Sequence, residues 1–188
     1  MENTLIYLIG YPGVGKLTVA KAVCAKTGAR LMDNHLVNNV AFTLIGADGV
    51  TPIAAPIWDE IRHIREAALR IVARHAPRHL SYVLTNVLLD EPGDRRQFAQ
   101  VRKTAADRRA MFVPVLLTCE EEENLSRIVA PERRKGLKEI DVAAARERRR
   151  SEPILAFEHP NRLDLDTTSL PPELAAAQII SHVESLNK

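Results

Sequence analysis

Residues 10–18, Gly-Tyr-Pro-Gly-Val-Gly-Lys-Leu-Thr, have the residue types and spacing of a loop that binds phosphate groups. The loop follows an apolar run at residues 5–9, which predicts a buried strand, and precedes residues 19–23, which begin a helical pattern. Glycines let the backbone turn tightly, so that successive N–H groups point into one concavity. The N-terminus of the following helix adds a partial positive charge. We therefore predict that this stretch binds the phosphates of a nucleotide.

Two side chains of the loop carry the rest of this chemistry. Lys16 supplies a full positive charge that can reach the outer phosphates, and Thr18 supplies a hydroxyl for an accompanying Mg²⁺. The common form of the loop has Ser or Thr directly after the lysine, whereas Leu17 stands there and cannot bind a metal. The metal is therefore held by Thr18 or mostly through water; a glycine-rich turn without a ligand is the weaker alternative. The residues predicted to bind the nucleotide are Gly10, Gly13, Val14, Gly15, Lys16, Leu17 and Thr18.

The elements that must position this loop follow from the apolar pattern. Five short apolar runs alternate with amphipathic segments, which predicts an α/β fold with a parallel, doubly wound sheet and helices on both faces. The expected strands are residues 5–9, 29–32, 80–86, 111–117 and 163–165, and the longer expected helices are residues 36–45, 56–76, 91–109 and 170–186. Pro114 is awkward within a strand, since proline is confined to edges or bulges. On the helix at residues 56–76, the arginines are expected mostly on a solvated face: Arg62, Arg65, Arg70 and Arg74.

Ligands of such sheets bind at the carboxyl ends of the strands, where this sequence has several polar side chains. Asp33 follows the second strand and can orient an acceptor hydroxyl or accept its proton; the weaker alternative is that it caps the next helix. His35 can bind the acceptor or assist proton transfer, or it can simply pack. Asn86 ends the third strand and can hydrogen-bond the waters of a metal ion. Asp90 is the alternative for that role, and the sequence leaves the choice open.

Composition limits the partners. A chain of 188 residues predicts a single domain over residues 1–188, and a formal charge of +2 gives no field that would recruit nucleic acid or a membrane. The arginines of residues 146–150 have no interleaved aromatic residues, so we expect no nucleic-acid partner. The first apolar run is too short for a signal or spanning segment, and the two cysteines predict no disulfide framework. We expect a cytoplasmic protein whose oligomeric state the sequence does not indicate.

The sequence resembles the small-molecule and nucleoside-monophosphate kinase branch of P-loop proteins, which includes adenylate, shikimate and gluconate kinases. Residues 10–18 are similar to the adenylate-kinase loop, which also has one residue between its lysine and its threonine. Residues 126–129 resemble the segment that leads into that family's mobile lid. Residues 163–167, followed by a proline-led helix, resemble its last strand and the loop near the base. The resemblance extends over nearly the whole chain in outline.

This resemblance implies a three-layer fold with strand order 2-3-1-4-5, ATP as donor, and a lid at about residues 130–140. It implies that Asp33 faces the acceptor, although His35 stands where shikimate kinases have a second aspartate, which argues against shikimate. Arg127 matches a lid arginine, but its usual partner four residues later is replaced by Pro131. Arg133 and Arg134 are the nearest substitutes. We expect these three arginines to neutralise phosphate charge, with a solvated basic loop as the alternative.

The expected function is therefore an ATP-dependent phosphotransferase that moves the γ-phosphate of Mg-ATP to a small hydroxylated or phosphorylated metabolite. The predicted catalytic residues are Lys16, Asp33, Arg127, Arg133 and Arg134; the predicted acceptor-binding residues are Asp33, His35 and Asn86. One alternative is a GTPase-like switch, because residues 87–93 mimic a strand followed by Asp-x-x-Gly; the sequence lacks the Asn-Lys-x-Asp motif that reads guanine. Another is an ATP-binding switch without an acceptor.

Overall fold

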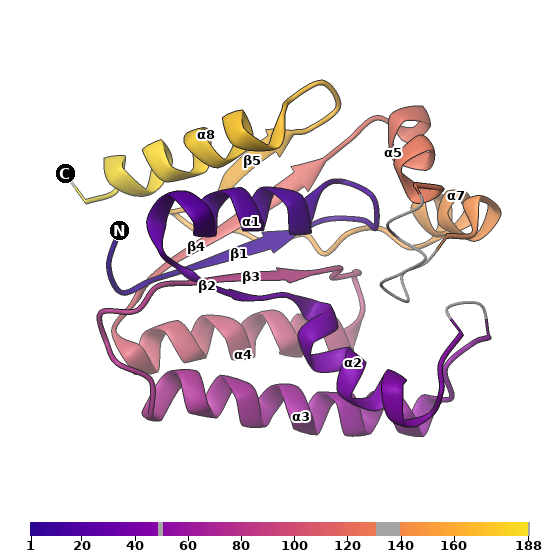
Figure 1. The fold of residues 1–188 in the computed structure, drawn as a ribbon, viewed down its shortest axis with the longest axis horizontal. Helices are drawn as coiled ribbons and strands as arrows, with labels where there is room; N and C mark the ends of the chain where they lie inside the picture. The colour runs from indigo at the N-terminus through magenta and orange to yellow at the C-terminus, as the bar shows by residue number, and fades with distance from the viewer. Residues whose placement is uncertain (49–50, 131–139, 188) are drawn as a thin grey trace.

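A five-stranded parallel sheet forms the centre of the molecule (Figure 1). The computed structural model describes residues 1–48, 51–130 and 140–187. Strand β1 (Thr4–Ile9) is central, between β3 (Tyr82–Asn86) and β4 (Met111–Thr118). The outer strands are β2 (Arg30–Met32) and β5 (Leu163–Asp166). The observed order β2-β3-β1-β4-β5 confirms the predicted fold class and the strand order that the resemblance implied.

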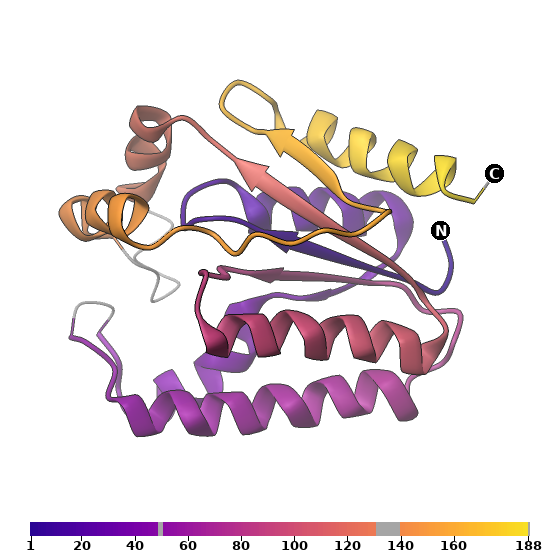
Figure 2. The ribbon, with the colours of Figure 1, turned by 180° about the vertical axis from the view of Figure 1, so that it is seen from behind.

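Two pairs of helices cover the two faces of the sheet, as Figures 1 and 2 show from opposite sides. Helices α1 (Lys16–Thr27) and α8 (Pro172–Ser185) pack on one face. Helices α3 (Ala55–Arg74) and α4 (Pro92–Arg108) pack on the other. The shorter helices α2 (Asn34–Leu44), α5 (Glu121–Ile128) and α7 (Val142–Ser151) lie toward the carboxyl ends of the strands.

Strand β1 divides the core between these two layers. All six of its residues are buried, as expected for the central strand of a parallel sheet. Because side chains alternate along a strand, Ile6 and Leu8 pack with the α1/α8 layer. Leu5, Tyr7 and Ile9 pack with the α3/α4 layer. The strand thus packs against both helical layers and ends where the predicted phosphate-binding loop leaves the sheet.

Pro114 is accommodated by the staggered length of the outer strand. It pairs with Tyr7 of β1, but the ladder between β4 and β5 begins one residue later, at Val115 and Leu163. The missing N–H of Pro114 therefore removes no hydrogen bond from the β4–β5 ladder.

Helix α2 begins at Asn34, two residues before the predicted Leu36, because the Asp33 side chain accepts a hydrogen bond from the backbone N–H of His35 and caps the helix.

Arg108, the last residue of α4, is almost fully buried, with 1% of its surface exposed. Its guanidinium donates to the carbonyl oxygens of Ala76, Pro77 and Leu80 at 3.0–3.3 Å. It donates also to the carbonyl of Val72, in the last turn of α3. The terminal carbonyls of a helix have no partner within it and carry a partial negative charge. Arg108 thus satisfies the end of α3 and the segment that leads into β3.

Replacing Arg108 by methionine is expected to lower the free energy of unfolding by about 2–4 kcal/mol, because several buried carbonyl groups lose their donor at once. Urea unfolding followed by circular dichroism measures the change. Arg102→Met is the matched control, since Arg102 is an exposed residue of the same helix, and its effect should stay within about 0.5 kcal/mol. Equal midpoints for the two variants would show that water can replace the guanidinium.

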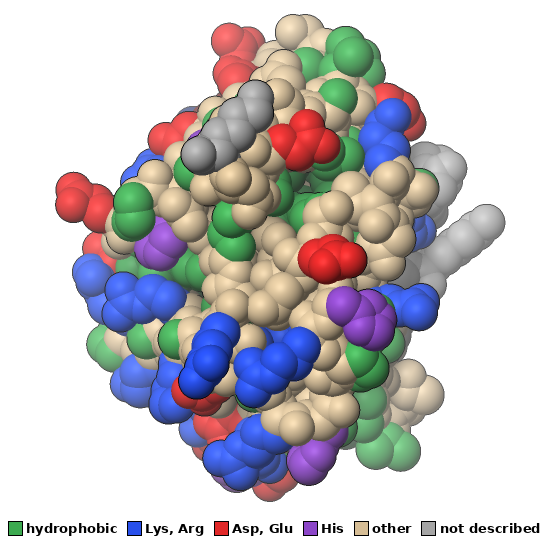
Figure 3. Space-filling view, turned by 90° about the vertical axis from the view of Figure 1, so that its left-hand side faces the viewer, with side chains coloured by type: hydrophobic (Ala, Val, Ile, Leu, Met, Phe, Trp, Pro, Cys, Tyr) green, Lys and Arg blue, Asp and Glu red, His purple; other side chains and the backbone are tan. Residues whose placement is uncertain are grey.

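The end of the molecule that carries the two termini lies away from the carboxyl edge of the sheet. Figure 3 shows this face, on which acidic, basic and hydrophobic side chains are interspersed.

In the three described stretches of chain, every helix is too short or too polar to cross a lipid bilayer.

Candidate functional site

A cavity of about 1800 Å³ opens at the carboxyl ends of the strands. Its walls come from the loop before α1, from α2 and the start of α3, from the segment after β3, and from α5 and α7. Such an edge is where parallel sheets bind their ligands. The predicted site residues among its lining are Gly13, Gly15, Lys16, Leu17, Thr18, Asp33, His35, Asn86 and Arg127. Arg133 and Arg134, and most of the predicted lid, lie outside the described residues.

The glycines of the loop permit close packing against β4 and α5. At Gly13, φ is 88°, and a Cβ atom would lie 2.5 Å from Nδ2 of Asn124. That amide nitrogen donates to the carbonyl of Pro12 at 2.7 Å. At Gly10 a Cβ would lie 2.4 Å from the carbonyl oxygen of Leu117. A larger residue at Gly10 must displace the backbone of β4, and one at Gly13 must displace the Asn124 side chain, so the loop is shaped by its packing as well as by its own turns.

Lys16 begins α1, and its ammonium group lies against the loop itself. Its Nζ atom donates to the carbonyl oxygens of Gly10 and Tyr11, each at 2.7 Å. Thr18 lies in the first turn of α1, exposed and on the cavity wall. The Lys16 ammonium and the exposed Thr18 hydroxyl therefore both lie in the first turn of α1, an arrangement suited to binding an anion.

The oxygen donors of the cavity fit Mg²⁺. The Thr18 hydroxyl shares the cavity with the carboxylates of Asp33, Glu91 and Asp94. The described part of the chain contains no group of three or more His, Cys, Asp or Glu residues that could hold a metal by themselves. Mg²⁺ in nucleotide sites usually takes one or two protein oxygens and completes its shell with waters and substrate phosphates. The donor set therefore suits a metal that arrives with its nucleotide.

Two hydrogen bonds hold the carboxylate of Asp33, the residue directly after β2. The Thr85 hydroxyl, on the neighbouring strand β3, donates to its Oδ1 atom. The backbone N–H of His35 donates to its Oδ2 atom at 3.3 Å. The capping role that the sequence offered as an alternative is thus present, and the carboxylate also lines the cavity. The imidazole of His35 lies edge-on to the ring of Phe42, with centroids 6.4 Å apart.

Between the two candidates after β3, Asn86 is the one at the cavity. Its side chain is buried, donates to the Tyr7 hydroxyl at 3.3 Å, and accepts from the backbone N–H of Val87 at 2.9 Å. Asp90 forms an ion pair with Arg95 and is absent from the described residues that line the cavity. The role of Asn86 toward a metal or an acceptor stays a prediction.

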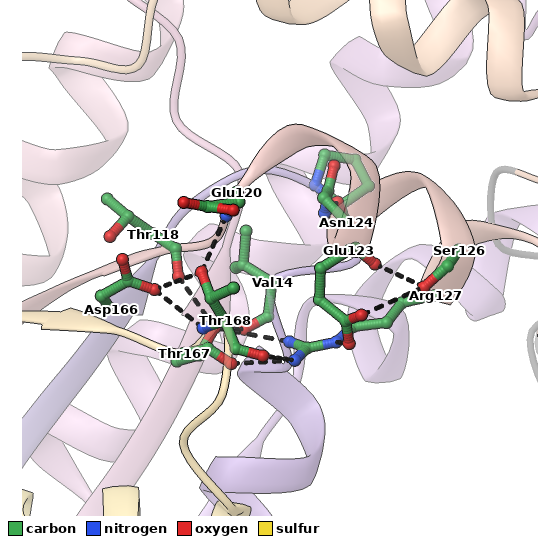
Figure 4. Close-up of polar contacts among 11 residues, drawn as sticks. Val14, Thr118, Glu120, Glu123, Asn124, Ser126, Arg127, Asp166, Thr167 and Thr168 are labelled. Carbon is green, nitrogen blue, oxygen red and sulfur yellow. Dashed lines mark hydrogen bonds and ion pairs between the residues drawn. The ribbon is translucent and has the colours of Figure 1, made fainter.

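Arg127 links three segments around the phosphate-binding loop (Figure 4). Its Nε atom donates to Glu123 at 2.7 Å, and its Nη2 atom donates to the carbonyls of Thr167 and Thr168 at 2.8 and 2.9 Å. The hydroxyl of Thr167 hydrogen-bonds the carbonyl of Val14 at 2.9 Å. The Arg127 guanidinium thus joins helix α5 to the β5–α8 connection, and the Thr167 hydroxyl joins that connection to the loop. Its contact with phosphate stays a prediction.

The sequence reasoning misplaced Arg65, which lies at the floor of the cavity rather than on the solvated face of α3. Its guanidinium donates to the amide oxygens of Gln97 and Asn34, each at 2.9 Å, and of Asn38 at 3.1 Å. Burial lowers the pKa of Arg65, while the nearby Tyr7 and Asp94 act in the opposite direction. All three acceptors are neutral amide oxygens, so none of these contacts pairs the positive charge of Arg65 with a carboxylate. Arg62, Arg70 and Arg74 are exposed, as expected.

The helical period carried a signal for this position. The buried residues of α3 are Ile61, Leu69 and Val72, so residue 65 falls on the same stripe. An arginine there interrupts an apolar face at a point where the interior is polar. Asp94 in the first turn of α4 was also missed: its carboxylate accepts from the backbone N–H of Leu89 at 2.6 Å, and burial raises its pKa. Nothing in its local sequence distinguishes it from a helix-start carboxylate.

Comparison with known proteins supplies a family and a fold. A family model described as "AAA domain" matches residues 6–154. No curated protein matches the chain. Among solved structures, a gluconokinase from Sinorhizobium meliloti 1021 aligns with a TM-score of 0.64 at 13% identity, over 98% of this chain and 93% of that chain.

Two further structures have similar agreement. A sugar kinase from Janibacter sp. HTCC2649 aligns with a TM-score of 0.64 at 17% identity, over 97% of this chain and 95% of that chain. The APS kinase of Mycobacterium tuberculosis, in complex with AMPPNP and APS, aligns with a TM-score of 0.60 at 18% identity, over 97% and 98% of the two chains. At these identities the likeness establishes the fold.

Proposed function

The chain belongs to the AAA-domain family, within the P-loop kinase-like superfamily, and from this premise we propose that it is an ATP-dependent small-molecule kinase. The reaction moves the γ-phosphate of Mg-ATP to a hydroxyl or phosphate oxygen of a small acceptor. One observation carries the proposal: the loop with Lys16 and the carboxylate of Asp33 line a single cavity. The volume of that cavity, about 1800 Å³, exceeds that of most single-ligand pockets, which supports two substrates side by side.

The donor half uses the loop and its lysine. The loop amides and the helix N-terminus hold the phosphate chain, and Lys16 exchanges its contacts with Gly10 and Tyr11 for phosphate oxygens. Thr18 would hold Mg²⁺, which neutralises phosphate charge when bound. Phosphoryl transfer needs positioning and charge neutralisation rather than covalent catalysis by the protein. Arg127 adds positive charge beside the loop, and the sequence assigns the same role to Arg133 and Arg134, which lie outside the described residues.

The acceptor half uses Asp33 and Arg65. Asp33 orients the acceptor hydroxyl and receives its proton, and its two hydrogen bonds fix the position of the carboxylate. Arg65 binds an anionic group of the acceptor, because a partly buried guanidinium with neutral amide partners gains most from a carboxylate or phosphate. His35 and Asn86, which line the same cavity as Asp33, contact the acceptor as well.

Two measurements test this function. Calorimetry with Mg²⁺ should detect ATP binding that is tighter than GTP binding, because the sequence lacks the motif that reads guanine. ADP release should then rise well above basal hydrolysis in the presence of one compound from a panel of nucleosides, nucleotides, sugar acids and antibiotics. ATP binding without any acceptor effect would favour a switch, and a strong preference for GTP would favour the GTPase-like alternative.

Arg65→Gln is expected to raise the KM for an anionic acceptor by about 10- to 100-fold, since a hydrogen bond to a charged group is worth about 1.5–3 kcal/mol. The KM for ATP should stay within about twofold, because the three amide groups that accept hydrogen bonds from Arg65 all lie outside the donor loop. Steady-state kinetics with the acceptor from the screen measures both constants. Arg70→Gln, an exposed position on the same helix, is the control. Equal KM values in the two variants would remove Arg65 from the acceptor site.

A further inference from the structure

An aromatic wall lines the acceptor side of the cavity. It consists of His35 and Phe42 on α2 and Trp58 on α3, which is the only tryptophan of the chain. The rings of Phe42 and Trp58 meet edge to face, with centroids 5.8 Å apart and planes at 85°. The ring of His35 approaches Phe42 from another direction at 64°. Edge-to-face pairs of this kind are favourable and fix the orientation of both rings.

Trp58 packs on the buried ring of Phe42, yet Trp58 itself is 45% exposed. Phe42 is buried and packs with Val37, Ala41 and Ile61 in a cluster that is separate from the two main core clusters. Trp58 contacts this cluster through its edge-to-face pair with Phe42. A tryptophan that merely closed a small core would gain by burying more of its large apolar surface. Instead its surface forms part of the cavity wall, beside Pro52 and Ile53.

The wall stands at a defined distance from the polar floor. Trp58 and Arg65 are seven residues apart on α3, so they lie on the same side of the helix and about 10 Å apart along its axis. Asp33 and His35, at the start of α2, line the same cavity. The acceptor side therefore offers, within one space, an apolar flat surface, a carboxylate and a guanidinium.

We propose that the acceptor carries a flat apolar ring that packs on Trp58, together with a hydroxyl that Asp33 orients and an anionic group that Arg65 binds. This inference rests on the proposed function and narrows its substrate to ring-bearing hydroxy acids or phosphates. An open-chain sugar acid has the hydroxyl and the anion but would leave the indole in contact with water. A ring removes apolar area of both partners from water, at about 25 cal/mol per Å².

Two acids that differ only by a ring test the proposal. Lactate has a hydroxyl and a carboxylate, and 3-phenyllactate has the same groups with a phenyl ring added. Since Trp58 is the only tryptophan, its intrinsic fluorescence reports directly on binding at the wall. We expect 3-phenyllactate to change the emission with a half-saturating concentration at least about tenfold below that of lactate. Equal half-saturation, or no change with 3-phenyllactate up to its solubility limit, would overturn the proposal.

Variants then separate the wall from the rest of the site. By calorimetry, Trp58→Ala should weaken 3-phenyllactate at least about tenfold and leave lactate unchanged, whereas Trp58→Phe should stay within about threefold of the parent. Ile71→Ala is the matched control, because Ile71 is an exposed apolar residue of the same helix and is not among the described residues that line the cavity. Undiminished binding of 3-phenyllactate to Trp58→Ala would assign the ring to another part of the cavity and refute the proposal.

The outcome does not depend on catalysis. Neither acid contains a triphosphate, so the fluorescence and calorimetry of the wall are independent of the nucleotide measurements. A ring-selective wall in a protein that binds no ATP would refute the kinase proposal and keep the aromatic site. ATP binding with no preference between the two acids would do the reverse.

Discussion

Lys16→Ala is expected to lower the rate of phosphoryl transfer by at least about 100-fold, which corresponds to about 2.7 kcal/mol of barrier. The ammonium is the full positive charge contributed by the loop itself, and its Nζ atom lies 2.7 Å from each of two loop carbonyl oxygens. Alanine keeps the helix but leaves both the phosphates and those carbonyls without the cation. Acceptor-dependent ADP release at saturating ATP measures the loss.

Lys26→Ala provides the comparison for this variant. Lys26 lies in the last turn of the same helix α1, far from the loop along the helix, and is not among the described residues of the cavity lining. Its removal should leave turnover within about twofold. Circular dichroism of both variants should match the parent, since neither lysine is buried. Full activity of Lys16→Ala would refute the assignment of the donor site.

Asp33→Asn is expected to spare ATP binding and to reduce acceptor-dependent turnover by about 10²- to 10⁴-fold, the usual contribution of a positioned acid or base. Asparagine has the same shape and remains a good helix cap, so it can still accept from the backbone N–H of His35. The fold is therefore conserved while the charge and the basicity are lost. Calorimetry with Mg-ATP and steady-state kinetics with the acceptor separate the two effects.

Each alternative role of Asp33 has its own result. If Asp33 only caps α2, Asp33→Asn will retain full turnover. If Asp33 supports the metal, the variant will lose ATP affinity in the presence of Mg²⁺. Asp59→Asn is the control, because Asp59 is an exposed residue of α3 that forms an ion pair with Arg62.

Local patterns determined most of the architecture. The run at residues 5–9 is buried throughout in β1, and Gly28 ends α1 with φ of 72°, the left-handed conformation that glycine adopts most readily. Asp141 caps α7 through the backbone N–H groups of Ala143 and Ala144. These features depend on neighbours in the chain, which periodicity and capping rules describe well.

The site depends on contacts between distant segments, and there the sequence was less informative. Arg65 was assigned to a solvated face because all four arginines of α3 were treated alike, whereas the amide oxygens that surround it come from α2 and α4. Arg127 binds carbonyls some forty residues later in the chain. That Asn86 lines the cavity while Asp90 pairs with Arg95 follows from the three-dimensional structure. Such pairings need the three-dimensional arrangement.

The central position of β1 has a consequence for how the protein is made. Its hydrogen-bonding neighbours are β3, which begins at Tyr82, and β4, which begins at Met111. A ribosome adds about 5–20 residues per second, so one edge of this apolar strand waits roughly 5 to 20 seconds for β4 to be synthesised. During translation the nascent chain therefore exposes the open edge of a strand that is fully buried in the folded protein.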